Sequence, residues 1–152
     1  MFELAGATEP GEPVSGAGDD ITTEVGSYVP EPGGGTRLLF VTIPPDAHMA
    51  LPSFDGPLYA AEQLKHGPGL GELFEPDGMH TTPTVDYVIL LEGELWLELD
   101  DGELTRLVAG DVVVQNATRH AWRNRSDQPA RMAVVLIGAA PAQPAEDGGA
   151  DS

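Results

Sequence analysis

Cysteine is absent from the 152-residue chain, which excludes disulfides and thiolate metal ligands and is typical of a cytoplasmic protein. Basic residues are scarce: seven Lys and Arg against 25 Asp and Glu give a formal charge of −18, a field that repels a phosphate backbone. Apolar runs long enough to span a membrane are missing, and the first residues lack the basic and apolar regions of a secretory signal. The sequence therefore predicts a cytoplasmic protein with neither nucleic acid nor a membrane as a partner.

Composition divides the chain into three parts. Residues 1–35 carry seven acidic and no basic residues among many Gly and Pro, and such a segment buries too little apolar surface to offset its ordering entropy. We expect it to be a flexible acidic segment, within which only Ile21 to Val29 has the apolar content of an edge strand. Residues 36–139 are expected to form one domain, and residues 140–152 a disordered tail.

Short apolar and β-branched stretches separated by turn residues follow one another through residues 36–139, which is typical of an all-β sandwich or barrel. Pro57 to His66 is the exception, because a Pro near its start and Gly67-Pro68 after it indicate a short helix, interpreted as a lid over one mouth of the barrel. The predicted strands are Thr36–Ile43, Leu70–Pro76, Tyr87–Leu91, Glu94–Leu99, Leu104–Val108, Val112–Gln115, His120–Asn124 and Met132–Ile137.

Two stretches, Gly78 to Gly93 and Gly110 to Asn124, carry the residues with chemical potential. His80, Thr82 and Asp86 occupy alternate positions of the first stretch and therefore share one face of an extended segment. Six residues separate Asp86 from Gly93, and three separate His120 from Asn124. These spacings resemble the two motifs of the cupin superfamily, in its small single-domain form, with Thr82 at the place of a second histidine and Asp86 at the place of a glutamate.

The resemblance implies an all-β fold, a single cupin barrel (a double-stranded β-helix, or jelly roll), flanked by the two acidic tails. It also implies that His80, Asp86 and His120 meet inside the barrel as catalytic residues and as ligands of one divalent metal. Two imidazoles and one carboxylate suit Fe(II) first, with Mn, Ni or Zn as further possibilities. The predicted walls of the substrate pocket are Thr82, Tyr87, Gln115 and Trp122.

Three functions remain open at this point. The leading prediction is a metal-dependent oxidoreductase that acts on an enol, diketone or phenol-like small molecule, because the motifs look like those of cupin oxidoreductases in secondary metabolism. The second is a metal-independent isomerase, cyclase or decarboxylase, in which the same three residues serve as acid and base. The third is a small-molecule-binding protein without turnover. A homodimer is also expected, and the outward-facing Trp96 of the strand Glu94–Leu99 favours it.

Overall fold

The computed structural model describes residues 2–4, by their backbone alone, and residues 26–140. The expected flexibility of the rest of the N-terminal segment and of the C-terminal tail concerns residues outside these ranges, as does most of the proposed edge strand Ile21 to Val29. The described elements are β1 (Phe2–Leu4), β2 (Thr36–Ile43), the 3-10 turn η2 (Asp46–His48), α1 (Gly56–His66), the 3-10 turn η3 (Gly71–Leu73), β3 (Thr84–Glu92), β4 (Glu94–Leu99), β5 (Leu104–Val108), β6 (Val112–Asn116), β7 (His120–Arg123) and β8 (Ala130–Gly138).

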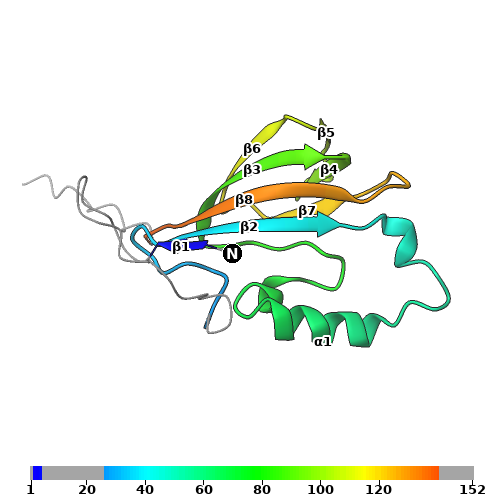
Figure 1. The fold of residues 1–152 in the computed structure, drawn as a ribbon, viewed down its shortest axis with the longest axis horizontal. Helices are drawn as coiled ribbons and strands as arrows, with labels where there is room; N and C mark the ends of the chain where they lie inside the picture. The colour runs from blue at the N-terminus through cyan, green and yellow to red at the C-terminus, as the bar shows by residue number, and fades with distance from the viewer. Residues whose placement is uncertain (1, 5–25, 141–152) are drawn as a thin grey trace, which may run out of the picture.

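The strands form two antiparallel sheets, which confirms the all-β barrel. The larger sheet has the order β1-β2-β8-β3-β6 and the smaller one the order β5-β4-β7. In Figure 1 the larger sheet lies in front of the smaller one, and α1 lies below both sheets. This order brings strands that are far apart in sequence side by side, since β8 lies between β2 and β3 along their full lengths.

The core lies between the two sheets and follows directly from strand alternation. Leu95 and Leu97 of β4 are buried, as predicted, while the side chains between and beside them are more exposed. They pack against inward-facing residues of the larger sheet, among them Leu90, Met132 and Leu136. Each buried side chain of this size stabilises the fold by about 1.5–3 kcal/mol relative to its exposed state.

Tight turns keep the strands in register. Gly93 joins β3 to β4 with a φ of 82°, and a Cβ at this position would lie 2.9 Å from the Cα of Ala130. Only glycine therefore fits between these strands. Residues 100–102 form the turn between β4 and β5, where the backbone N–H of Gly102 donates to the carbonyl of Leu99.

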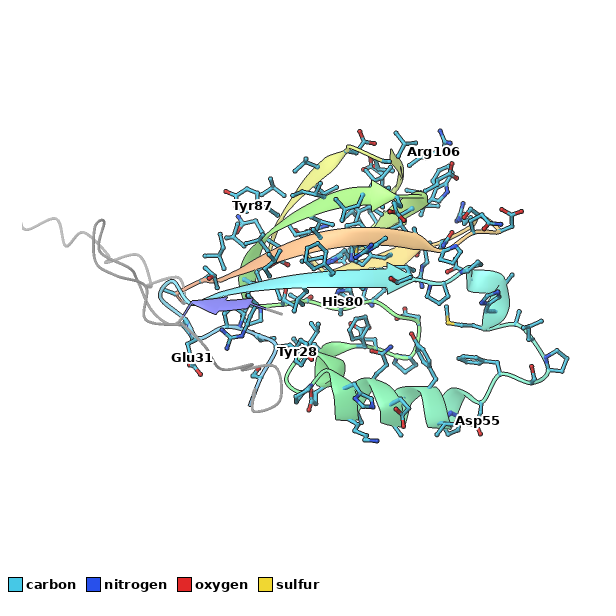
Figure 2. All side chains as sticks on the ribbon, viewed as in Figure 1. Tyr28, Glu31, Asp55, His80, Tyr87 and Arg106 are labelled. Carbon is cyan, nitrogen blue, oxygen red and sulfur yellow. The ribbon has the colours of Figure 1, made fainter. Side chains whose placement is uncertain are left out.

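For the segments around the barrel, the structure confirms one prediction and corrects two. The predicted helix is confirmed as α1, whose N-cap Asp55 accepts from the backbone N–H of Leu58 (Figure 2). Leu70–Pro76 is not a strand: η3 occupies its start, because Gly67 and Gly71 close successive turns after the helix. Residues 26–29 hold no strand either, and Tyr28 donates its backbone N–H to the carbonyl of Pro68.

Candidate functional site

The two histidines of the motifs are brought together by the backbone. His80 and His120 face each other across an antiparallel bridge, in which each N–H donates to the other's carbonyl at 2.9 and 3.0 Å. Residues opposed in this way project their side chains on the same side. The two rings lie with their centroids 4.3 Å apart and their planes tilted by 49°. The sequence predicted that barrel closure would join these residues, and the structure shows the bridge that does so.

Each ring is held in one tautomer by a backbone carbonyl. His80 donates from Nδ1 to the carbonyl of Gly78 at 3.2 Å, and His120 donates from Nδ1 to the carbonyl of Thr118 at 2.8 Å. Because a carbonyl only accepts, Nδ1 carries the proton in the neutral ring and Nε2 keeps its lone pair. Both rings therefore present a basic nitrogen.

Burial keeps both imidazoles neutral. Burial and, to a smaller extent, the neighbouring His120 together lower the pKa of His80 to about 4. The pKa of His120 is also lowered by burial, although the nearby carboxyl of Asp86 opposes this effect. At neutral pH the two rings are therefore uncharged and able to accept a proton.

Asp86 supplies a carboxyl group inside the barrel. It sits on β3 with a side chain only 4% exposed, and its Oδ2 accepts from the Thr82 hydroxyl at 3.1 Å. Burial raises the pKa of Asp86, while the hydroxyls of Thr84 and Thr82 and the charge of His120 oppose the rise. Its Oδ1 is buried and has no hydrogen-bond partner. Thr82 thus acts through Asp86, at a position where the family pattern has a histidine.

The wall beside Asp86 is polar and incompletely paired. Gln115 of β6 lies directly opposite Asp86 in the register of β3 and β6, and its side chain is buried. Its Nε2 has no hydrogen-bond partner. The hydroxyl of the fully buried Thr84 makes no hydrogen bond of normal geometry, yet it lies close enough to Asp86 to oppose the rise in the pKa of that carboxyl. Leaving a buried polar atom unpaired costs about 1–3 kcal/mol, so such atoms on one wall require an explanation.

Two aromatic side chains flank the imidazole pair. Trp122 meets the ring of His120 edge-on, with centroids 5.4 Å apart, and packs against the core. Phe74 stacks on His80 at 4.2 Å, and sequence reasoning missed it because the segment was interpreted as a strand. Arg119 anchors this segment, since it pairs with Glu75 at 2.6 Å and with Asp100 at 2.7 Å. The salt bridges explain how a segment outside the sheets is held over the site.

One predicted pocket residue lies elsewhere. Tyr87 is 44% exposed and lies on the outer face of the larger sheet, at the edge of the molecule in Figure 2. The physical reason is alternation: Asp86 points inward, so the next residue along β3 points outward. Asn124 is fully buried but structural, because its amide group bonds to the carbonyls of Ile43 and Gln128.

The predicted metal triad fits in its chemistry but not in its placement. Two Nε2 lone pairs and the unpaired Oδ1 of Asp86 are suitable donors for a divalent ion. Nevertheless, within residues 2–4 and 26–140, no three His, Asp or Glu side chains converge closely enough to hold a metal. The structure therefore joins His80 to His120 as predicted and leaves Asp86 near them without completing a three-ligand group.

Within the described residues, eight antiparallel strands surround a buried histidine pair with an acid beside it. Residues 71–136 match the family model described as "Cupin domain". This part of the chain, less than half of its length, is therefore similar to cupin domains. Among the described residues, no helix is both long and apolar enough to cross a membrane.

Several curated proteins are similar to part of the chain. A phomopsin biosynthesis cluster protein of Diaporthe leptostromiformis is 48% identical over 64 residues, which cover 41% of this chain and 34% of that protein. A cupin-domain-containing oxidoreductase of Hypocrea virens is 42% identical over 66 residues, with 41% and 34% coverage. The chain thus spans about a third of the length of the curated relatives it matches.

Solved structures that are similar to part of the chain include cupins. A cupin family protein of Methanocaldococcus jannaschii with a double-stranded β-helix fold has a TM-score of 0.46 and 15% identity, over 78% of this chain and 84% of that one. A cupin barrel domain protein of Salinispora arenicola has a TM-score of 0.33 and 30% identity, over 35% and 44%.

Proposed function

We propose that the chain is an enzyme of small-molecule metabolism whose reactive centre is His80, His120 and Asp86, and that these residues transfer protons at a carbonyl-containing substrate. One observation carries the proposal: two buried, neutral imidazoles lie side by side, each with its Nδ1 held by a carbonyl. A base that is neutral at the working pH and fixed in one tautomer needs no rearrangement before it accepts a proton.

The roles follow from the protonation states. One Nε2 takes a proton from a C–H bond next to the substrate carbonyl, and the electron pair moves onto the carbonyl oxygen. Asp86, whose pKa is raised by burial, is suited to exchange a proton with an O–H or N–H group beside that oxygen. Return of the proton to a different carbon gives isomerisation. Attack of the enol carbon on a second carbonyl of the same molecule, whose oxygen receives the electron pair and then a proton, gives cyclisation.

Proton exchange in heavy water tests this chemistry without knowledge of the natural substrate. A panel of neutral ketones and hydroxyketones is incubated with the protein and excess EDTA in D₂O, and loss of the C–H signal is followed by NMR. We expect exchange with the wild type and at least a hundredfold slower exchange in His80→Gln and His120→Gln, as expected for loss of a general base. His48→Gln, at an exposed position, is the matched control and should exchange at the wild-type rate.

A metal-dependent oxidoreductase is the second candidate. It is favoured by the anchored Nδ1 atoms, since metal-binding histidines commonly donate their other ring N–H to a carbonyl. Proteins similar to this chain include cupin-domain-containing oxidoreductases, which favours the same candidate. When bound, Fe(II) would supply Lewis-acid and O₂ chemistry, with His80, His120 and Asp86 as the residues to hold it.

Elemental analysis separates the two candidates. Protein prepared without an affinity tag is measured for Fe, Mn, Ni and Zn, together with the His80→Gln and His120→Gln variants. A near-stoichiometric metal that both variants lose, and activity that disappears with EDTA, would replace the acid–base proposal by the metal-dependent one. Exchange activity that persists in EDTA supports the acid–base proposal. Binding of small molecules with no turnover of any kind would leave a binding protein.

A further inference from the structure

The unpaired polar atoms next to the histidines form an ordered set. Asp86 Oδ1 is an acceptor and Gln115 Nε2 is a donor, while the Thr84 hydroxyl beside Asp86 can act as both and makes no hydrogen bond of normal geometry. All three side chains are at least nine-tenths buried. They belong to two neighbouring strands, because Asp86 and Gln115 are direct partners across β3 and β6 and Thr84 is two residues before Asp86 on the same face.

The set is not a by-product of a polar core. Leu136, the partner of Asp86 on the other side of β3, is buried and apolar, as are Val88 and Leu90, which follow Asp86 on the inward face of its strand. Elsewhere in the described interior, Asn124 uses both ends of its amide group. The remaining unpaired buried side-chain atom of the described residues is Trp96 Nε1, on the outward side of β4, so those that face the interior lie in one corner, beside the imidazoles.

We propose that Asp86, Gln115 and Thr84 form a recognition subsite for a neutral carbonyl compound that carries an O–H or N–H group beside the carbonyl. The Gln115 amide donates to the carbonyl oxygen, Asp86 Oδ1 accepts from the adjacent O–H or N–H, and the Thr84 hydroxyl pairs with either. This inference rests on the proposed function, since it names the substrate class of the same site.

Charge narrows the class further. A carboxylate substrate would approach a chain of formal charge −18 and would meet the carboxyl of Asp86 in the site. A neutral enol, hydroxyketone or lactam meets neither barrier. Such a molecule also carries a hydrogen-bond acceptor and a donor side by side, and these match the amide of Gln115 and the carboxyl of Asp86. A site with buried polar groups rejects analogues that leave those groups unpaired.

The probe is 2-pyridone, a small neutral lactam, and its comparison is N-methyl-2-pyridone, which keeps the carbonyl and lacks the N–H. Both are titrated into the full ¹⁵N-labelled chain in EDTA, and dissociation constants are taken from the side-chain amide signal of Gln115. We expect 2-pyridone to bind at least about tenfold more tightly than the N-methyl compound. This comparison uses only the wild-type protein, so it does not depend on whether any variant folds.

A sharper test is to swap the carboxyl of Asp86 and the amide of Gln115 between their two positions. Gln115→Glu places two acceptors on the wall and Asp86→Asn places two donors, and each single variant should bind 2-pyridone at least about tenfold more weakly. The double variant, with Asp86→Asn and Gln115→Glu, restores one donor and one acceptor in reversed order. 2-Pyridone can bind to the double variant in the reversed orientation, so its affinity should recover. Gln63→Glu on the exposed α1 is the control for the added charge.

The outcomes are decisive for the subsite. Equal affinity for the two pyridones, no binding of 2-pyridone to the wild type, or a double variant as weak as the single ones would overturn the inference. Failure of the proposed function looks different: proton exchange would be unaffected in His80→Gln and His120→Gln, while the preference for the N–H compound and its recovery in the double variant would remain.

Discussion

Burial of His80 should make the stability of the protein depend on pH in a defined window. The unfolded imidazole takes up a proton as the pH falls through 6.5, whereas in the folded protein its pKa is about 4. Between these values the unfolded state binds more protons, so the free energy of unfolding falls as the pH falls. Above pH 6.5 both states are neutral and the contribution to stability is complete.

The magnitude follows from the size of the shift. With about 1.4 kcal/mol for each pKa unit, His80 accounts for a loss of about 2 kcal/mol between pH 7 and pH 5, and about 3 kcal/mol once the pH is below 4. His120 adds a loss of the same sign, because its pKa is also lowered. Asp86 acts in the opposite direction, because its raised pKa lets the folded state take up a proton first.

Urea denaturation followed by tryptophan fluorescence measures this contribution at pH 7 and pH 5. Carboxylates elsewhere also titrate, so the informative quantity is the change in unfolding free energy with pH in the wild type minus the same change in His80→Gln. We expect this difference to be about 2 kcal/mol, and to vanish for the exposed His48→Gln control. A His80→Gln variant that loses as much stability on acidification as the wild type would refute the reasoning.

Three further predictions concern the core and the surface. Leu90→Ala should destabilise the fold by about 2–5 kcal/mol in thermal or chemical denaturation, whereas Leu91→Ala, on the outer face, should change stability by less than about 1 kcal/mol. Asn124→Ala should cost about 3 kcal/mol, because it leaves the carbonyls of Ile43 and Gln128 without their partner, and an Asn124→Asp variant that is equally stable would contradict this. We propose that the expected homodimer forms through the outer face of the larger sheet, where Val114 is 59% exposed. Val114→Lys should then convert dimers to monomers in sedimentation. A wild type that sediments as a monomer would exclude this dimer.

Most of the strands were predictable because strand alternation and turn residues are local rules, whereas the histidine pair was predictable through the resemblance to the cupin motifs. Alternation placed His80, Thr82 and Asp86 on one buried face, and the structure confirms this. The same rule would have moved Tyr87 to the outer face, had it been applied beside the family pattern. Trp96 shows the limit of the rule: it points away from the core as expected, yet it is only partly exposed and the guanidinium of Arg125 lies over its ring.

Other parts of the site depend on contacts that no local pattern encodes. The pairing of Asp86 with Gln115 is set by the register of β3 and β6, which are separated by β4 and β5 in the chain. The position of Phe74 over His80 depends on Arg119, which joins the segment around Glu75 to the turn at Asp100. Neither partner is close in sequence, so spacing alone gave no signal for them.

The bridge between His80 and His120 has a consequence for how the site is lost. Its two hydrogen bonds join backbone atoms, and they close the barrel between β7 and a segment outside the regular strands. Local opening of this seam would separate the imidazoles while both sheets are still intact. Amide hydrogen exchange at these two residues should therefore report the fraction of molecules that are folded but inactive. Replacement of either imidazole, in contrast, leaves these two backbone hydrogen bonds in place.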